Sequence, residues 1–379
     1  GTGWSSPIVA DGRVFITDRR GDEERVVALD LRSGSFLWGR GHPVDFDPHA
    51  VGRRHGNGPK ATPCFAGGRI YSLGIAGWLE CLDAASGHTT WTIHLPAKYG
   101  ERETLRDGRA FVNGTENVIV PVGDGQGAPV PLFGYTGSPL VHRGLLVCAV
   151  GGARGGTIMA FDAATGNERW RALHENVAYS SPIVAKLGGI EQVVVMTGPS
   201  VVGLCLDDGQ LLWRHPFQIQ YDESISTPAV AGNLVIVTGD GKPLTALRIE
   251  SRGEQLSVEV AWKNFVLSSY LSSMLVDGEY LYGMNDTGEF VCVRISDGET
   301  VWAGGNHGFY STPVLCGDRL LALNEEGALV ILRATPQHYQ LLASCQLSQS
   351  ATWTSPAVVE AQIVVRTETD IRCFDFGAE

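Results

Sequence analysis

The residues best suited to chemistry gather near the start of the chain. His42, Asp45, Asp47, His49 and His55 share one Gly-rich stretch. Imidazole and carboxylate groups are common metal ligands, so this stretch could bind a metal ion. Their spacing matches no recognised metal site, however, and His and Asp side chains in loops are mostly solvated. We therefore expect no metal there.

Other motifs that carry chemistry are absent from the sequence. There is no GxSxG, no phosphate-binding loop and no HExxH, so hydrolase and nucleotide chemistries have no support. The segment GDGQGAPVP, Gly123 to Pro131, lacks the spacing of a calcium loop. The 8 Cys are never adjacent and never in CxxC or CxxCH spacing, which argues against zinc and haem sites.

Charge and hydropathy exclude two further classes of partner. The net charge of −12 at pH 7 argues against nucleic acid, because affinity for the phosphate backbone depends on clustered Lys and Arg. No apolar run approaches the roughly 20 residues that span a bilayer. We therefore expect neither a nucleic-acid partner nor a transmembrane segment in this chain.

A repeat that runs along the chain predicts how candidate residues are positioned. ALDLRSGSFLW (Ala28 to Trp38) returns as CLDAASGHTTW and AFDAATGNERW, and a Ser/Thr-Pro-apolar signature such as SSPIVA or STPAVAG precedes each unit. Counting LSSMLVDG, which has Met274 in the Pro slot, there are eight units, with a period of about 40 residues. Four short strands per unit predict one eight-bladed β-propeller over residues 1–379, an all-β fold of four-stranded antiparallel blades.

The repeated residues have structural explanations. Asp30, Asp83 and Asp162 can accept backbone N–H groups of a turn, and the following glycines, Gly34, Gly87 and Gly166, can adopt a left-handed conformation. Cys81, Cys292 and Cys373 occupy the slot of Ala28, so we expect them to be small buried packing residues. The tryptophans of the outermost strands are expected to pack blade against blade. They are Trp38, Trp91, Trp170, Trp213, Trp262 and Trp302.

The last unit contains only three recognisable strands before the chain stops: SPAVV, QIVVRTE and IRCFDF. Propellers commonly close by pairing the two chain ends. We therefore expect its fourth strand to come from residues upstream of Gly1, or the ring to be incompletely sealed.

Candidate binding residues follow from the repeat. Insertions at about 41–60 and 96–135 each join the outer strand of one blade to the inner strand of the next, so both lie on one face. Loops on a rigid scaffold often carry binding groups. Aromatic residues just ahead of the inner strands could stack a flat ligand, a sugar or a peptide side chain, or simply plug the channel. The candidates at this channel mouth are Trp4, His55, Asn57, Lys60, Tyr135, Tyr179, Asp222, Glu223, Tyr310 and Trp353.

The motif A-x-D-x-x-[ST]-G-x-x-x-W, with its SSP inner strands, resembles the repeat of pyrroloquinoline-quinone (PQQ)-type propellers over essentially the whole chain. The chain looks most like short, single-domain members, typically exported, of planctomycete-type bacteria. These are similar to the outer-membrane assembly lipoprotein propeller, which binds partners and no quinone, and to quinoprotein alcohol dehydrogenases, which bind PQQ and Ca²⁺. The resemblance implies a bacterial, extracytoplasmic protein, periplasmic or secreted. The dehydrogenases also carry a vicinal Cys pair that this sequence lacks, and no residues of their calcium site can be assigned here.

Three functions remain open. We favour a non-catalytic binding or scaffold protein that holds a ligand or partner at the insert-bearing channel mouth, because the repeat is preserved whereas the quinone-site signature is absent. The first alternative is a PQQ- and calcium-dependent oxidoreductase of alcohols or sugars. The second is a carbohydrate-binding propeller. The sequence does not name the protein, small-molecule or carbohydrate ligand, and we expect a monomer.

Overall fold

The computed structural model describes residues 1–48, 50–99, 109–111, 119–121, 131, 133–152, 156–253 and 255–377. The chain divides into two compact units, each described by itself. Unit 1 is Gly1–Pro182 with Thr197–Pro199 and Asp207–Leu211. Unit 2 is Ile183–Met196, Ser200–Leu206 and Leu212–Glu379.

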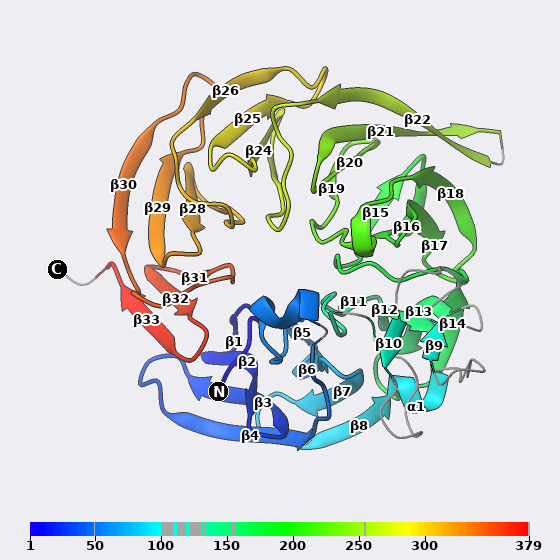
Figure 1. The fold of residues 1–379 in the computed structure, drawn as a ribbon, viewed down its shortest axis with the longest axis vertical. Coiled ribbons are helices and arrows are strands. Elements are labelled where there is room, and N and C mark those ends of the chain that lie inside the picture. The colour runs from blue at the N-terminus through cyan, green and yellow to red at the C-terminus, as the bar shows by residue number, and fades with distance from the viewer. Residues whose placement is uncertain are drawn as a thin grey trace. The chain divides into compact units, whose positions relative to one another are not determined.

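Unit 1 contains three four-stranded antiparallel sheets, or blades, and one short strand pair (Figure 1). Its helices are η1 (Ala50–His55) and α1 (Leu95–Tyr99). The first blade is β1 (Ile8–Ala10), β2 (Arg13–Arg20), β3 (Glu23–Asp30) and β4 (Phe36–Pro43); the second is β5 (Cys64–Ala66), β6 (Arg69–Leu73), β7 (Trp78–Asp83) and β8 (Thr89–His94); the pair is β9 (Arg109–Phe111) with β10 (Ile119–Pro121); and the third blade is β11 (Leu140–His142), β12 (Leu145–Gly152), β13 (Gly156–Asp162) and β14 (Glu168–Ala172).

Unit 2 contains four four-stranded blades and a final sheet with three described strands. Its helix is η2 (Gln220–Asp222). The blades are β15 (Ile183–Leu187), β16 (Ile190–Met196), β17 (Ser200–Cys205) and β18 (Leu211–Pro216); β19 (Ala229–Ala231), β20 (Leu234–Gly239), β21 (Lys242–Arg252) and β22 (Gln255–Asn264); β23 (Leu275–Asp277), β24 (Tyr280–Met284), β25 (Phe290–Arg294) and β26 (Thr300–Gly304); β27 (Val314–Cys316), β28 (Arg319–Leu323), β29 (Ala328–Arg333) and β30 (Leu341–Gln346); and β31 (Ala357–Val359), β32 (Gln362–Arg366) and β33 (Ile371–Asp375).

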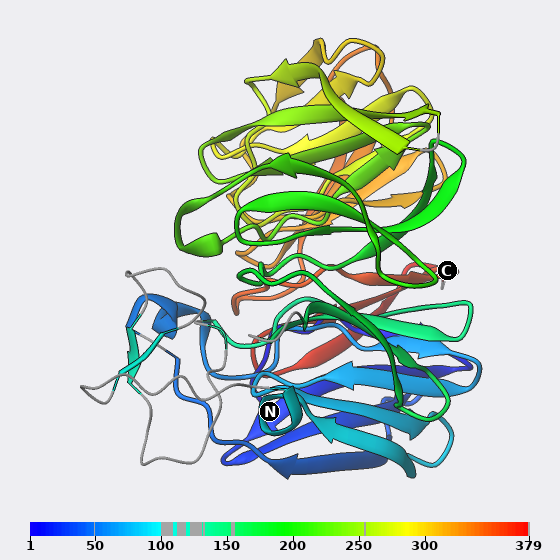
Figure 2. The same ribbon diagram turned by 90° about the vertical axis from the view of Figure 1, so that its right-hand side faces the viewer.

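Within each sheet, strands that follow one another in the chain pair antiparallel. The fold is an eight-bladed β-propeller, as the repeat predicts. Because the strands alternate in direction, the turn between second and third strands and the connection to the next blade lie at one edge of a blade, which we call the connection edge. The other two turns lie at the opposite edge, which we call the hairpin edge. In Figure 2 the strands of unit 1 run across the view, and η1, in blue, lies beyond their left-hand ends, at the connection edge.

The repeated Asp closes the hairpin turn. The carboxylate of Asp30 accepts hydrogen bonds from the Ser33 backbone N–H (2.8 Å) and hydroxyl (2.7 Å), while its own carbonyl accepts the N–H of Gly34. The hydrogen bonds from Ser33 hold the pKa of Asp30 below its usual value. Gly34 has φ +68°, which confirms the left-handed turn expected from the sequence. The same bonds recur at Asp83 and Asp162.

The small residue of the motif lies directly opposite the Trp. Ala28 pairs with Trp38 across β3 and β4, and Cys81 pairs with Trp91 across β7 and β8. The register shifts by one residue immediately afterwards in both pairs, so the outer strand bulges next to the Trp. Within a pleated pair a small side chain leaves room for the indole opposite it. This explains why the position opposite the Trp is occupied by a small residue, Ala28 in one blade and Cys81 in the next.

The Trp of one blade also packs on the motif Gly of the next. The indole N–H of Trp38 donates to the carbonyl of Ala84 (3.2 Å), and a Cβ placed on Gly87 would lie 2.5 Å from the Trp38 ring. A Cβ placed on the corresponding Gly166 would lie 2.8 Å from the Trp91 ring. The glycine therefore has two reasons to be Gly, a positive φ and contact with an aromatic ring.

Apolar clusters lie between neighbouring blades of the same unit. In unit 1 one cluster joins Phe15 and Ala28 of the first blade to Ile70 and Leu82 of the second.

Cys81 and Cys292 are fully buried, as expected, but Cys373 is exposed, so the expectation that it is a buried packing residue was wrong. The reason is that β33 is the outermost described strand of its sheet, with no described strand beyond it to bring a Trp opposite Cys373. In the described part of the chain, every helix is too short or too polar to cross a bilayer.

Candidate functional site

The described residues of the first long connection, 44–48 and 50–63, form a folded platform at the connection edge of unit 1. It leaves β4, includes η1 and leads to β5. Val44 and Phe46 are buried against the turn between β6 and β7. The buried guanidinium of Arg19 donates to the carbonyl of Phe46 (2.9 Å). An apolar cluster and a buried cation therefore hold the platform in place, so its exposed groups are presented by a rigid surface.

Several predicted site residues meet on this platform. The indole N–H of Trp4 donates to the carbonyl of His55 (3.0 Å), and the Lys60 ammonium donates to the carbonyl of Phe133 (3.5 Å). The Phe133 ring lies edge-on to His55 at 6.3 Å and to Tyr179 at 5.2 Å. Phe133 therefore connects the two long connections. Sequence reasoning missed it, although its position among the aromatic residues at the end of the second insertion was a signal.

Two other predicted residues differ in accessibility. Asn57 is exposed, and its backbone carbonyl accepts a hydrogen bond from Arg19 (3.1 Å). Tyr135 is only 5% exposed and belongs to the apolar cluster of the second and third blades, where burial raises its pKa. Tyr135 is thus a core side chain, and we leave it out of the binding surface.

Two buried carboxyl groups and a histidine lie beneath the connection edge. Glu24 accepts the N–H of Ile75 (2.9 Å), and Glu80 accepts the hydroxyl of Ser72 (3.4 Å). His42 lies between them, with Nε2 3.9 Å from Glu24 and Nδ1 3.5 Å from Glu80. Burial raises the pKa of each carboxyl group to about 7, and for Glu80 repulsion by Glu24 adds to it. Burial likewise lowers the pKa of His42 to about 4.

Such groups could exchange protons near neutral pH, yet both carboxyl side chains are almost completely buried. A general acid or base must come within hydrogen-bond reach of its substrate. We therefore assign Glu24 and Glu80 a structural role. Sequence reasoning missed the pair, because the two residues are far apart in the chain and neither forms part of a recognised motif.

Burial also shifts the pKa values of two basic side chains on the platform. Burial lowers the pKa of Lys60 to about 8, against the opposing charge of Glu24. Burial also lowers the pKa of His55 to about 4, with added repulsion from Arg54 and Lys60. At neutral pH the platform therefore presents a neutral His55 beside cationic Arg53 and Arg54, both of which are exposed.

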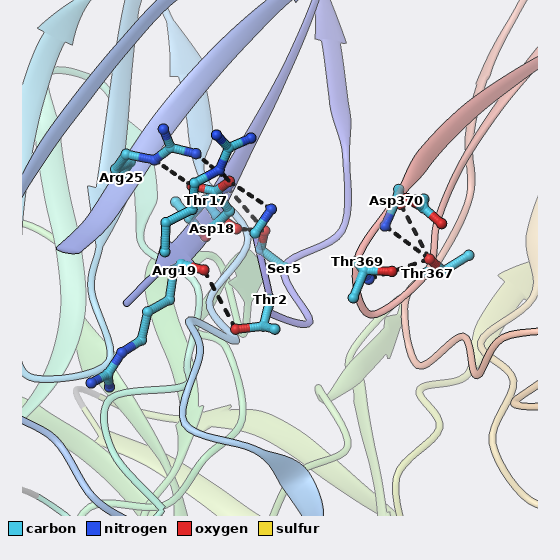
Figure 3. A network of polar contacts seen from close by, with 11 residues as sticks. Thr2, Ser5, Thr17, Asp18, Arg19, Arg25, Thr367, Thr369 and Asp370 are labelled. Atoms are coloured by element: carbon cyan, nitrogen blue, oxygen red, sulfur yellow. Dashed lines mark hydrogen bonds and ion pairs between the residues drawn. The ribbon is translucent and has the colours of Figure 1, made fainter. Parts of the chain in front are cut away.

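A second buried charge lies close to the start of the chain. Asp18 accepts two hydrogen bonds from Arg25, at 2.9 and 2.6 Å, and Ser5 bonds to Thr17 beside it (Figure 3). Burial alone would raise the pKa of Asp18, but the hydrogen bonds and positive charges of Arg25 and the terminal amine together outweigh it, and the pKa is lowered. The pair fixes the ends of β2 and β3 at the connection edge.

In unit 2, the Thr367 hydroxyl accepts the backbone N–H of Asp370 and closes the β32–β33 turn (Figure 3).

In unit 2 a row of predicted residues follows the connections between blades. The Tyr270 hydroxyl donates to the carboxylate of Glu223 (2.9 Å), the Tyr270 and Tyr310 rings lie 6.4 Å apart, and Tyr310 lies 5.6 Å from Trp353. Asp222 is half-buried at the end of η2. Tyr270 was missed, although it stands one residue before the expected slot, as Tyr135 does in its own blade.

The acidic and imidazole groups that the sequence offered as metal ligands lie apart from one another in the described residues. No group of three or more His, Cys, Asp or Glu side chains is placed to hold a metal ion in the part of the chain that the structure describes. Of the first-insert candidates, His42 faces Glu24 and Glu80 whereas Asp45 and Asp47 are exposed. His49 and most of the second insertion, with Gly123 to Val130, lie outside the described residues. We therefore derive no step through PQQ or Ca²⁺.

Known proteins resemble this chain in both sequence and fold. The quinohemoprotein alcohol dehydrogenase ADH-IIG of Pseudomonas putida is 27% identical over 170 residues, 44% of this chain and 19% of that enzyme, so the match spans about a fifth of its length. The outer membrane protein assembly factor BamB of Yersinia pestis is 20% identical over 343 residues, 81% of this chain and 82% of that protein. The crystal structure of BamB from Moraxella catarrhalis shares the fold, with a TM-score of 0.65 at 15% identity, over 99% of this chain and 95% of that one.

The family model described as outer membrane protein assembly factor BamB matches residues 22–304, which is well over half of the chain. It covers most of the repeat units from which the fold was predicted. The chain therefore belongs to this family of PQQ-like propeller repeat proteins.

Proposed function

We propose that this protein is a non-catalytic binding or scaffold protein, and that its partner binds the platform at the connection edge of unit 1. The observation that carries the proposal is how the platform's polar groups are used. Trp4 and Lys60 donate to backbone carbonyls, and Arg19 ties the platform to the blade. These groups build a rigid surface, whereas a catalytic site needs groups that remain available to a substrate.

The platform presents Asn57, His55 and the two arginines Arg53 and Arg54 to a partner. Arg is enriched among the residues that dominate binding energy at protein interfaces. The partner is therefore a protein rather than a small molecule held in a pocket. Because its relatives include outer membrane protein assembly factors, we further propose that the protein works outside the cytoplasm.

The test places a photo-crosslinking amino acid at position 57 in cells that produce the protein. Ser86, exposed in a turn at the hairpin edge of the second blade, provides the matched control position. We expect a discrete protein adduct from position 57 and none from position 86. Equal labelling from both positions, or none from position 57, would remove the platform as the binding surface.

A second measurement tests the non-catalytic part of the proposal. Purified protein is titrated with PQQ in excess Ca²⁺ while its Trp fluorescence is followed, and dye-linked oxidation of alcohols and sugars is then assayed. We expect no saturable quenching and no turnover. Saturable binding accompanied by turnover would instead support the oxidoreductase suggested by the relative in Pseudomonas putida.

A further inference from the structure

The connections between blades in unit 2 expose large apolar side chains. Phe265 is 80% exposed and Phe309 58% exposed, and Tyr221 and Val266 are also exposed. They lie on three successive connections, residues 217–228, 265–274 and 305–313, all at the connection edge. The contacts of Tyr270 with Glu223 and Tyr310 show that these connections are neighbours. Large exposed apolar side chains grouped on one surface commonly mark an interaction site.

These side chains are displayed on loops that are held firmly. The buried Asn264 accepts the N–H groups of Val266 (2.9 Å) and Leu267 (3.0 Å) through Oδ1 and donates to Gly298 through Nδ2 (2.8 Å). Phe265 therefore projects from a fixed turn. Apolar anchors that are already ordered lose little entropy when a partner binds.

The loop that carries Phe309 is fixed by a charged group. The carboxylate of Glu325 accepts the N–H of Phe309 (2.8 Å) and of Tyr310 (3.1 Å). Asn324 also donates to the carbonyl of His307 (3.1 Å). The turn between β28 and β29 thus supports the connection that displays Phe309.

The connection edge of unit 2 is strongly acidic. The segments outside strands at this edge contain nine Asp or Glu and no Lys or Arg. The adjoining strand ends add the cations Lys242, Lys263 and Arg372, of which Arg372 pairs with Asp370, so acidic groups remain in excess. Among described residues the exposed Asp240, Asp286 and Glu326 form no ion pair. At the hairpin edge, by contrast, Arg294 pairs with Asp297. The nine acidic residues are Asp222, Glu223, Asp240, Asp286, Glu289, Glu325, Glu326, Glu368 and Asp370.

We propose that the connection edge of unit 2 is a docking surface for a protein segment that presents apolar side chains flanked by Lys or Arg. Burial of Phe265 and Phe309 supplies affinity, and the surrounding carboxylates attract and select a basic partner. A second copy of this chain is disfavoured, since two acidic surfaces repel each other. The proposal rests on the binding function proposed above, and it names a second surface and the chemistry of its partner.

The test selects random peptides displayed on phage against the wild-type protein and measures the affinity of the enriched peptides. We expect them to combine aromatic or aliphatic residues with Lys or Arg. The double variant Phe265→Ser, Phe309→Ser should weaken their binding by about tenfold or more. Asp240→Lys with Asp286→Lys should weaken it and reduce its salt dependence. Leu341→Ser, which changes a 45% exposed residue at the hairpin edge of unit 2, is the matched control and should leave the affinity unchanged.

All these substitutions are at exposed positions, and circular dichroism verifies that each variant is folded. The absence of enriched peptides, peptides without basic residues, or equal affinity for all variants would overturn the proposal. So would self-association of the wild-type protein that the double Phe variant abolishes. Crosslinking from position 57 with no effect of the unit 2 substitutions would leave the proposed function intact and remove only this surface. Quinone-dependent turnover would remove the proposed function itself.

Discussion

Replacing Gly87 by Ala tests the packing of one blade on the next. Gly87 has φ +70°, and an added Cβ would lie 2.5 Å from the Trp38 ring. The ring cannot tilt away without losing the hydrogen bond from its N–H to the Ala84 carbonyl. Gly34 occupies the same motif position with φ +68°, and a Cβ there would meet nothing within 4 Å. Gly34→Ala therefore measures the backbone cost alone.

The expected magnitudes follow from these two terms. A left-handed conformation costs an L-residue about 1–2 kcal/mol, which we expect to be the whole loss of unfolding free energy for Gly34→Ala. Overpacking adds about 1–3 kcal/mol, so Gly87→Ala should lose about 2–5 kcal/mol. Urea unfolding followed by circular dichroism measures both values. In a Trp38→Ala background the cost of Gly87→Ala should fall to that of Gly34→Ala. Equal costs for the two glycines in the wild-type background would refute the packing argument.

Three further predictions concern buried groups. Trp170→Ala should lower the unfolding free energy by about 3–5 kcal/mol, because the indole is buried, and a wild-type denaturation midpoint would contradict this. Arg25→Gln should cost up to about 3–5 kcal/mol at pH 7, because it removes two hydrogen bonds from the buried Asp18 carboxylate. Since the folded pKa of Asp18 is lowered, the loss should shrink as acid protonates it, whereas the surface control Arg294→Gln should have a much smaller effect. The pKa of Glu80 rises from 4.5 to about 7 on folding, so its contribution to stability is lost as pH rises through that range. Glu80→Gln should therefore gain about 2–3 kcal/mol on the wild type between pH 5 and pH 8 in urea titrations, and a constant difference between the two proteins would show that this carboxyl group does not titrate there.

The repeat made the blades predictable because it encodes local interactions. Asp30 and Gly34 are four residues apart, and their turn follows from side-chain oxygen and backbone geometry alone. The second role of Gly87 was not predictable, since it depends on a Trp that arrives from the previous blade.

The candidate sites were predicted less completely, for a related reason. The repeat offset selected Trp4 and Tyr310 as candidates, but it did not give their partners. Phe133 and Tyr270 complete the aromatic contacts, and both depend on the paths of individual loops. The buried Glu24 was also missed, because its burial results from the way the platform and second blade enclose it.

The division between the two edges of a blade has a physical origin. At the hairpin edge, the turn that contains Gly87 is also the surface on which Trp38 packs, so changes there disturb the contact between blades. Connections at the other edge leave that contact untouched, and insertions in surface loops cost little free energy. Both candidate binding surfaces lie there: the platform with Asn57 in unit 1, and the exposed Phe265 and Phe309 in unit 2. A repeat that fixes one edge for stability thus leaves the other free to acquire binding surfaces, which is where the function of this propeller is to be sought.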